Sequence, residues 1–217
     1  MKIALLTHTD AAFKPVSDLT IPVFKEYCAR YSYDFICKLE HTSGRHIVWE
    51  KIALILDHFK YHKDDFDWII YCDADVMIMN HTIPLENFID DKVDFIGTND
   101  CHGYNAGVFF LKNSPWSLGF MRAVWHVDPR NPILRGRYND TQAEQLAMVA
   151  MMKSVGDKDA HIKIVKQSLF NAFPYHHWNI NHPDGNFKEG DFILHLPGMN
   201  TEERVHYFNK YKDLIVK

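Results

Sequence analysis

The sequence predicts an α/β fold in a single domain, residues 1–217, with a mixed, mostly parallel sheet flanked by helices on both faces. Short apolar runs alternate with segments of helical spacing up to residue 72, a pattern typical of parallel strands joined by helices. The 217 residues are 47% hydrophobic, enough to bury one sizeable core. The apolar run Trp68 to Cys72 leads into carboxylates, and open α/β sheets bind ligands where their strands end.

The N-terminal third is expected to supply three strands and two helices. Ser17 offers an N-cap for a helix that continues through Cys28 and carries apolar residues on one side. Residues 47–59 also carry apolar side chains at helical spacing. The expected strands are residues 2–7, 34–39 and 68–72.

After residue 75 the pattern is less regular. Ser114-Pro115 is expected to open a helix through Trp125, because proline is tolerated in the first helical turn. Another helix is expected near Thr141, and Asn200 with Glu203 suits a capping pair at the start of the last helix. The remaining expected elements are a short helix at 84–88, strands at 94–97, 107–111 and 192–196, and a structured loop at 171–190.

Composition and charge argue against several classes of protein. The net charge is −4 and no dense Lys or Arg tract is present, which argues against nucleic acid as a partner. No apolar run reaches the length of a membrane span, and the chain turns polar at Thr7, too early for a signal peptide. The four cysteines form no CxxC pair and are expected to be reduced thiols, so we expect a cytoplasmic location. The chain could equally be a domain of a longer protein.

Two aspartates separated by one residue give the strongest chemical signal in the chain. On a strand, side chains two residues apart share a face, so Asp73 and Asp75 are expected to point the same way. Two carboxylates about 4 Å apart repel by roughly 4 kcal/mol at an effective dielectric constant near 20, so a cation between them is expected. A divalent metal ion is the simplest candidate. Thr7 and Asp10 follow the first strand and are expected to meet a nucleoside at the same edge.

Beyond the paired aspartates, which are common by chance, further segments carry a family resemblance. They are Tyr27–Tyr33, Trp49-Glu50-Lys51, Asp67–Asp75, Asn105–Ser117, Glu144-Gln145, Asn171–Pro174 and Gly190–Gly198. In this order, and over most of the chain after about residue 27, they resemble the nucleotide-sugar glycosyltransferases of the GT-A fold. More narrowly, they resemble the family that contains the yeast Golgi α-galactosyl- and mannosyltransferases and the plant xyloglucan xylosyltransferases.

The resemblance implies a metal site and a nucleotide-sugar donor, with UDP-sugar the expected one. Asp73, Asp75 and His195 would bind a divalent cation that bridges the two phosphates of the donor. Two carboxylates and an imidazole suit Mn²⁺ better than Mg²⁺. Gly198 would let the backbone approach the phosphates, and Lys51 would add a cationic contact. Residues 1–100 would form the nucleotide-binding part, and residues 101–217 the acceptor and catalytic part.

The resemblance also implies sugar transfer to a hydroxyl of a carbohydrate or glycoprotein, with retention at the anomeric carbon. In that reaction the departing diphosphate assists the incoming hydroxyl, while Gln145 or Glu144 steadies positive charge on the sugar. Asn105 is expected to touch the donor sugar or the acceptor. An inverting reaction would instead need a carboxylate base near the acceptor, and the sequence leaves both routes open. Candidates for that base are Asp100, Asp140 and Glu144; candidates for an acceptor platform are His176, His177, Trp178 and His182.

Several alternatives stay open from the sequence. Thr141 and Glu144 have the spacing of a capping box, which would account for Glu144 without catalysis. A phosphohydrolase of the haloacid dehalogenase type also ends a strand with two aspartates and uses the first as nucleophile, although on its first strand. A transferase homologue that binds nucleotide or glycan without turnover is a third possibility. Met199 stands where relatives often carry cysteine, which implies a missing disulfide.

Overall fold

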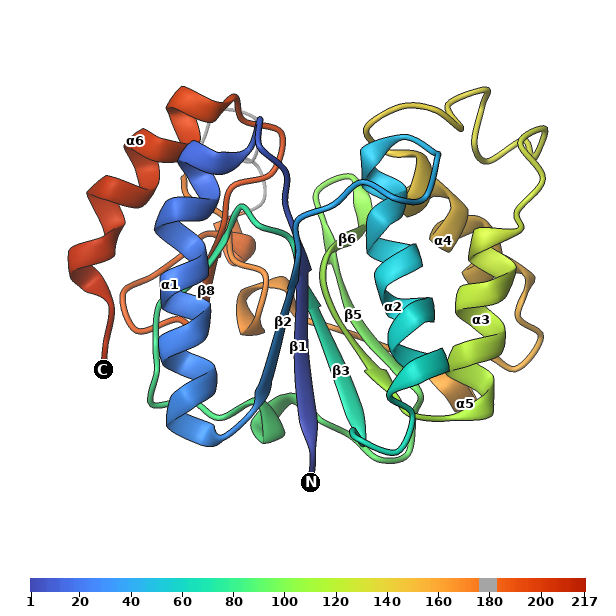
Figure 1. Cartoon of the computed structure of the whole chain (residues 1–217), viewed down its shortest axis with the longest axis horizontal. Helices are drawn as coiled ribbons and strands as arrows, with labels where there is room; N and C mark the ends of the chain where they lie inside the picture. Colours follow the sequence, from blue (N-terminus) through green and yellow to red (C-terminus); the bar gives the residue numbers. More distant parts are fainter. Residues whose placement is uncertain (176–182) are drawn as a thin grey trace.

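The computed structural model describes residues 1–175 and 183–217 (Figure 1). In this part of the chain a six-stranded sheet has the order β2-β1-β3-β6-β5-β7. Only β6 runs antiparallel to its neighbours, and the pairs β1–β2, β1–β3 and β5–β7 are parallel, which confirms a mixed, mostly parallel sheet. The strands are β1 (Ile3–His8), β2 (Asp34–Lys38), β3 (Trp68–Cys72), β5 (Phe95–Asp100), β6 (Gly103–Lys112) and β7 (Ile162–Val165).

Helices cover both faces of the sheet, as predicted. In Figure 1, α1 and α6 lie on one side, and α2, α3 and α4 lie on the other. The two sides bury alternate residues of β1: Ile3 and Leu5 pack with Phe24 of α1, whereas Ala4 and Leu6 pack with Ile52 of α2. The helices are α1 (Lys14–Tyr31), α2 (Glu50–Tyr61), α3 (Pro115–Trp125), α4 (Ala143–Ser154), α5 (Lys158–His161) and α6 (Thr201–Tyr211).

A second, two-stranded sheet pairs β4 (Val76–Ile78) with β8 (Ile193–His195) in antiparallel register, with Val76 opposite His195. The strand β8 was expected, but β4 was not, because its three residues continue the apolar run after the aspartates. This small sheet places the end of β8 directly beside the residue that precedes β4, which is Asp75. Short 3₁₀ helices lie at Ile47–Trp49, Leu85–Phe88, Gln167–Leu169, Pro183–Gly185 and Lys212–Leu214.

Two of the four expected helix caps are correct and two are wrong. Ser114 accepts a hydrogen bond from the backbone of Ser117, and Asn200 forms the expected capping box with Glu203. Ser17 is not an N-cap, because α1 begins earlier, at Lys14, after a turn in which Asp10 accepts from the backbone N–H of Phe13 at 2.8 Å. Thr141 and Glu144 form no capping box, because α4 begins at Ala143 and the Glu144 side chain points into the core. Among the described residues, no helix is both long and apolar enough to cross a membrane.

Candidate metal and sugar-nucleotide site

The paired aspartates lie in a turn between two strands of different sheets. β3 ends at Cys72, the backbone N–H of Asp73 donates to Gly107 at 2.7 Å, and β4 starts at Val76. The sequence predicted that the two aspartates share one face of a strand. This prediction is wrong, because both lie in the turn after β3. They converge because the turn folds back at the carboxyl end of β3, the upper edge of the sheet in Figure 1.

His195 completes a group of three possible metal ligands. One ligand atom each from Asp73, Asp75 and His195 lies within 4.8 Å of the others. The imidazole Nε2 is 3.4 Å from Asp75 Oδ1, and both of these side chains are buried, whereas 27% of the Asp73 side chain is exposed. The group is thus closed on the protein side and open at Asp73, as a site for an ion and its substrate requires. The structure brings together the three residues that the sequence named.

Asp75 is also bound by an arginine that sequence reasoning missed. Both Nε and NH2 of Arg204, from α6, lie 2.9 Å from Asp75 Oδ2, and Nε also donates to the Leu196 carbonyl at 3.1 Å. Burial is the largest influence and raises the pKa of Asp75, but His195 and Arg204 together outweigh it and hold that pKa below its ordinary value. Asp75 is therefore ionised, with Oδ1 left to face the imidazole.

Asp73 shares a buried lysine with Glu144. Lys51 Nζ lies 3.1 Å from Asp73 Oδ1, 3.0 Å from Glu144 Oε1 and 2.9 Å from the Ala106 carbonyl. An ammonium group has three N–H donors, so this arrangement uses all of them, and a phosphate contact would require one bond to break. Burial lowers the pKa of Lys51, but Asp73 and Glu144 overcome burial and raise it above its ordinary value.

Glu144 keeps one oxygen without a partner. Its Oε1 accepts from Lys51, but no other described residue hydrogen bonds to its buried Oε2. Burial, the largest influence, raises the pKa of Glu144. The neighbouring Gln145 accepts from the Ala106 N–H at 2.9 Å, which turns its NH2 group away from β6. The first turn of α4 therefore places a carboxyl oxygen of Glu144 near Asp73, with which Glu144 shares Lys51, and anchors Gln145 to β6.

The end of β1 contributes buried polar side chains to the site. Thr7 and Thr9 are buried, and within the described ranges their hydroxyl oxygens have no hydrogen-bond partner. Asp10 is engaged with the turn before α1. His8, which sequence reasoning missed, donates from Nδ1 to the Tyr71 hydroxyl at 2.6 Å, since Tyr71 itself donates to Asp73 at 3.1 Å. Burial lowers the pKa of His8 to about 4, so this ring is neutral at pH 7.

Other expected site residues lie around β6 and β8. Asn105 accepts from the Gly107 N–H at 2.9 Å and donates to Asp100 at 2.9 Å. Gly198 has a φ of +70°, a conformation that favours glycine, three residues after His195. Asp140 is held by Arg137 outside this cluster. The expected acceptor platform, His176, His177, Trp178 and His182, lies outside the described residues.

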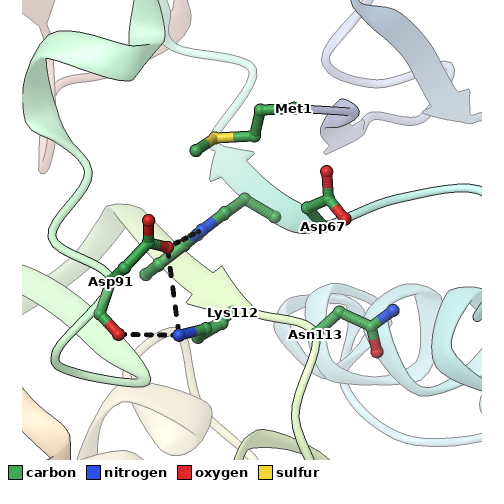
Figure 2. Close-up of a pocket in the computed structure, with 6 residues that line it drawn as sticks. Met1, Asp67, Asp91, Lys112 and Asn113 are labelled. Atoms are coloured by element: carbon green, nitrogen blue, oxygen red, sulfur yellow. Dashed lines mark hydrogen bonds and ion pairs between the residues drawn. The ribbon is translucent and has the colours of Figure 1, made fainter.

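A hollow of about 400 Å³ lies at the opposite end of the sheet (Figure 2). There Asp91 contacts Lys112 and Trp68, the first residue of β3. The aspartate pair follows the last residue of the same strand, so this hollow is not part of the site. A second group of possible metal ligands, Asp100, Cys101 and His102, lies at the turn between β5 and β6, but Asp100 already accepts from the His102 backbone and from Asn105.

We predict that Gly107→Ala displaces His195 and weakens metal binding by about 10- to 100-fold. A Cβ atom at this position would lie 2.2 Å from His195 Cε1 and 2.9 Å from Nε2, so the ring must move. Calorimetric titration with Mn²⁺ measures the effect. Gly119→Ala in α3 is the matched control, because a Cβ there meets nothing within 4 Å. Unchanged Mn²⁺ affinity in Gly107→Ala would contradict a ligand role for His195.

Comparisons with known proteins identify the family of this chain. The galactosyl transferase GMA12/MNN10 family matches residues 20–93 and 89–206. A probable α-1,6-mannosyltransferase, MNN10 of Saccharomyces cerevisiae, is 24% identical over 225 residues, which cover 85% of this chain and 56% of that protein. The chain thus spans only about half the length of this curated relative.

Solved structures share the fold. A glycosyltransferase involved in the glycosylation of the major capsid of PBCV-1 superimposes with a TM-score of 0.75 at 16% identity, covering 97% of this chain and 100% of that one. The galactosyltransferase LgtC, solved with donor and acceptor sugar analogs, has a TM-score of 0.56 at 11% identity and covers 96% of each chain. The haloacid dehalogenase alternative is not favoured by any of these matches. With its GT-A fold, the chain belongs to the galactosyl transferase GMA12/MNN10 family of glycosyltransferases.

Proposed function

We propose that this chain transfers a sugar from a nucleoside diphosphate, with UDP as the expected nucleotide, to a hydroxyl of a carbohydrate or glycoprotein acceptor. The observation that carries the proposal is the convergence of Asp73, Asp75 and His195 at the carboxyl edge of the sheet, within 4.8 Å. This edge is where open α/β folds bind nucleotides. Relatives named as mannosyl- and galactosyltransferases support a hexose as the transferred group.

The donor atoms of these three residues fit a divalent metal ion. Asp73 and Asp75 offer carboxylate oxygens, and His195 offers Nε2, a ligand set that suits Mn²⁺ better than Mg²⁺. The second oxygen of Asp75 is already taken by Arg204, which leaves Oδ1 of Asp75 for the ion. An ion bound there would neutralise negative charge on the diphosphate as it leaves.

The protein's own residues would then orient the donor sugar. Oε2 of Glu144, which has no hydrogen-bond partner among residues 1–175 and 183–217, can accept a hydrogen bond from a sugar hydroxyl, and the NH2 group of Gln145 can donate to one. Lys51 lies 3.0 Å from Glu144 and opposes the burial that raises the pKa of this carboxyl group; in its ionised form, Glu144 would meet positive charge that develops on the sugar with a negative charge. We infer that the sugar is transferred with retention, with Gln145 and Glu144 as the catalytic residues. The cytoplasmic location stays a prediction.

A panel of nucleotide sugars tests the proposal. We expect thermal stabilisation by UDP, and by one or a few UDP-sugars, that requires Mn²⁺ and disappears with EDTA. Release of UDP in the presence of carbohydrate acceptors should follow the same metal dependence. Binding of UDP without consumption of any donor would instead favour a non-catalytic role. Turnover of an aryl phosphate with Mg²⁺ in place of sugar transfer would overturn the proposal.

A further inference from the structure

Asn171 is a fully buried polar residue that connects the metal ligand His195 with Asn105. It follows the short helix Gln167–Leu169, and its side chain has 0% exposure. Its Oδ1 lies 2.7 Å from His195 Nδ1, and its Nδ2 lies 3.1 Å from Asn105 Oδ1 and 2.8 Å from the Thr98 hydroxyl. Every polar atom of this amide is thus engaged, and none is left to contact a substrate.

The direction of each hydrogen bond in this network follows from its two ends. The backbone N–H of Gly107 can only donate, so the atom of Asn105 that faces it at 2.9 Å is the oxygen. The other end of the same amide faces Asp100 at 2.9 Å, and a carboxylate accepts, so that atom is the nitrogen. Both ends agree, and the orientation of Asn105 is fixed without reference to the ligand site.

The orientation of Asn105 in turn determines the orientation of the Asn171 amide and which nitrogen of His195 carries a proton. Because Asn105 presents an oxygen to Asn171, the atom of Asn171 that meets it must be the NH2 group. The oxygen of Asn171 then faces His195 Nδ1, so Nδ1 must carry a proton and donate it. With the Nδ1 proton held by Asn171, Nε2 is the nitrogen that can give up its proton to hold a metal ion, and it faces Asp75 Oδ1 at 3.4 Å. In the absence of a metal ion, a proton on Nε2 would lie between this nitrogen and Asp75, and a metal ion bound there would replace that proton.

We propose that Asn171 is a positioning residue that fixes His195 as the Nδ1–H tautomer, with Nε2 free for a metal ion, and holds Asn105 with the same amide. The inference rests on the proposed metal-dependent function. The backbone supports this role, because the backbone N–H of His195 donates to the Ala172 carbonyl at 2.8 Å and keeps the imidazole next to Asn171. Partners of this kind on metal-binding histidines are typically worth 10- to 100-fold in metal affinity.

Two substitutions distinguish the hydrogen bond of Asn171 with His195 from its hydrogen bonds to Asn105 and Thr98. Asn171→Ala removes all of these hydrogen bonds, and we expect Mn²⁺ affinity to fall 10- to 100-fold. Asn171→Asp keeps an acceptor for His195 Nδ1–H but loses the donors to Asn105 and Thr98, so Mn²⁺ affinity should stay closer to that of the unaltered protein. Asn113→Ala is the matched control: Asn113 also donates two hydrogen bonds, to Lys63 and Phe66, at the far end of the sheet. It should lower thermal stability and leave Mn²⁺ affinity unchanged.

The tautomer itself is measured on the metal-free protein. Long-range ¹H–¹⁵N NMR spectra, with the His195 signals identified by their loss in His195→Gln, should show a proton on Nδ1 in the unaltered protein and in Asn171→Asp. In Asn171→Ala, where Asp75 Oδ1 still faces Nε2 and the acceptor at Nδ1 is gone, we expect the Nε2–H tautomer to gain population. Retention of the Nδ1–H tautomer together with unchanged Mn²⁺ affinity in Asn171→Ala would overturn the inference. If the unaltered protein bound no Mn²⁺, the proposed function would fail, while the NMR comparison would still decide the role of Asn171.

Discussion

Asp75→Asn is expected to lower the metal-dependent release of UDP from the correct donor by about 1,000-fold while the protein stays folded. A metal ion that stabilises the leaving diphosphate contributes several kcal/mol, and each 1.36 kcal/mol corresponds to a tenfold change in rate. The introduced asparagine keeps an oxygen for the hydrogen bonds from Arg204 but removes the negative charge that the ion needs. Alanine at this position would leave the Arg204 guanidinium without its partner and would mix a folding defect into the result.

The measurement is the rate of UDP release over a series of Mn²⁺ concentrations, with thermal unfolding as the test of folding. Asp91→Asn is a suitable control, because Asp91 also contacts a cation, Lys112, but lies in the hollow at the far end of the sheet (Figure 2). It should release UDP at the normal rate. Full turnover by Asp75→Asn at ordinary Mn²⁺ concentrations would refute the metal site.

Lys51→Met is expected to lower the free energy of unfolding by about 3–5 kcal/mol, the usual cost of removing one partner from a buried ion pair. Lys51 is 3% exposed at its side chain and contacts both Asp73 and Glu144, so its loss leaves two carboxylates near each other without their shared cation. For a chain of this size each kcal/mol lowers the melting temperature by roughly 2–4 °C, so a fall of about 10 °C is expected. Thermal unfolding at pH 7 gives the value.

A second substitution distinguishes this structural role from a phosphate contact. Adding Glu144→Gln to Lys51→Met removes one of the unpaired charges and should restore part of the lost stability. A lysine that served only to bind donor phosphate would show a different result. The KM for the nucleotide sugar would rise, the melting temperature would stay within about 2 °C, and Glu144→Gln would bring no recovery.

Local sequence patterns predicted the parts of the fold that depend on neighbouring residues. The strand Trp68–Cys72 is a continuous apolar run, and the caps at Ser114 and Asn200 depend on side chains and backbone within one turn. The strand β4 was not predicted because its three residues continue the apolar run after the aspartates, and β7 was not predicted because its four residues are only partly buried and pair with the distant strand β5. Ser17 was misjudged because Asp10 offers the turn before α1 a closer acceptor.

The candidate site was predictable as far as the family motifs reach. Asp73, Asp75 and His195 were named from the sequence and converge in the structure. Arg204 and the pairing of Lys51 with Glu144 were not found, because the hydrogen bond from Lys51 to Glu144 spans 93 positions and that from Arg204 to Asp75 spans 129. In the sequence, Arg204 is one charge among several on an expected terminal helix. Only the folded chain shows that it faces inward.

The bond between α6 and Asp75 changes how the end of the chain should be regarded. A C-terminal helix in an α/β protein is often treated as dispensable packing that can be trimmed, tagged or exchanged. Here its second turn supplies the counter-ion of a buried aspartate and also holds the Leu196 carbonyl, one residue beyond His195. Shortening or regrafting that helix would therefore alter the surroundings of Asp75 directly, and protein engineers should count Arg204 among the residues to be preserved.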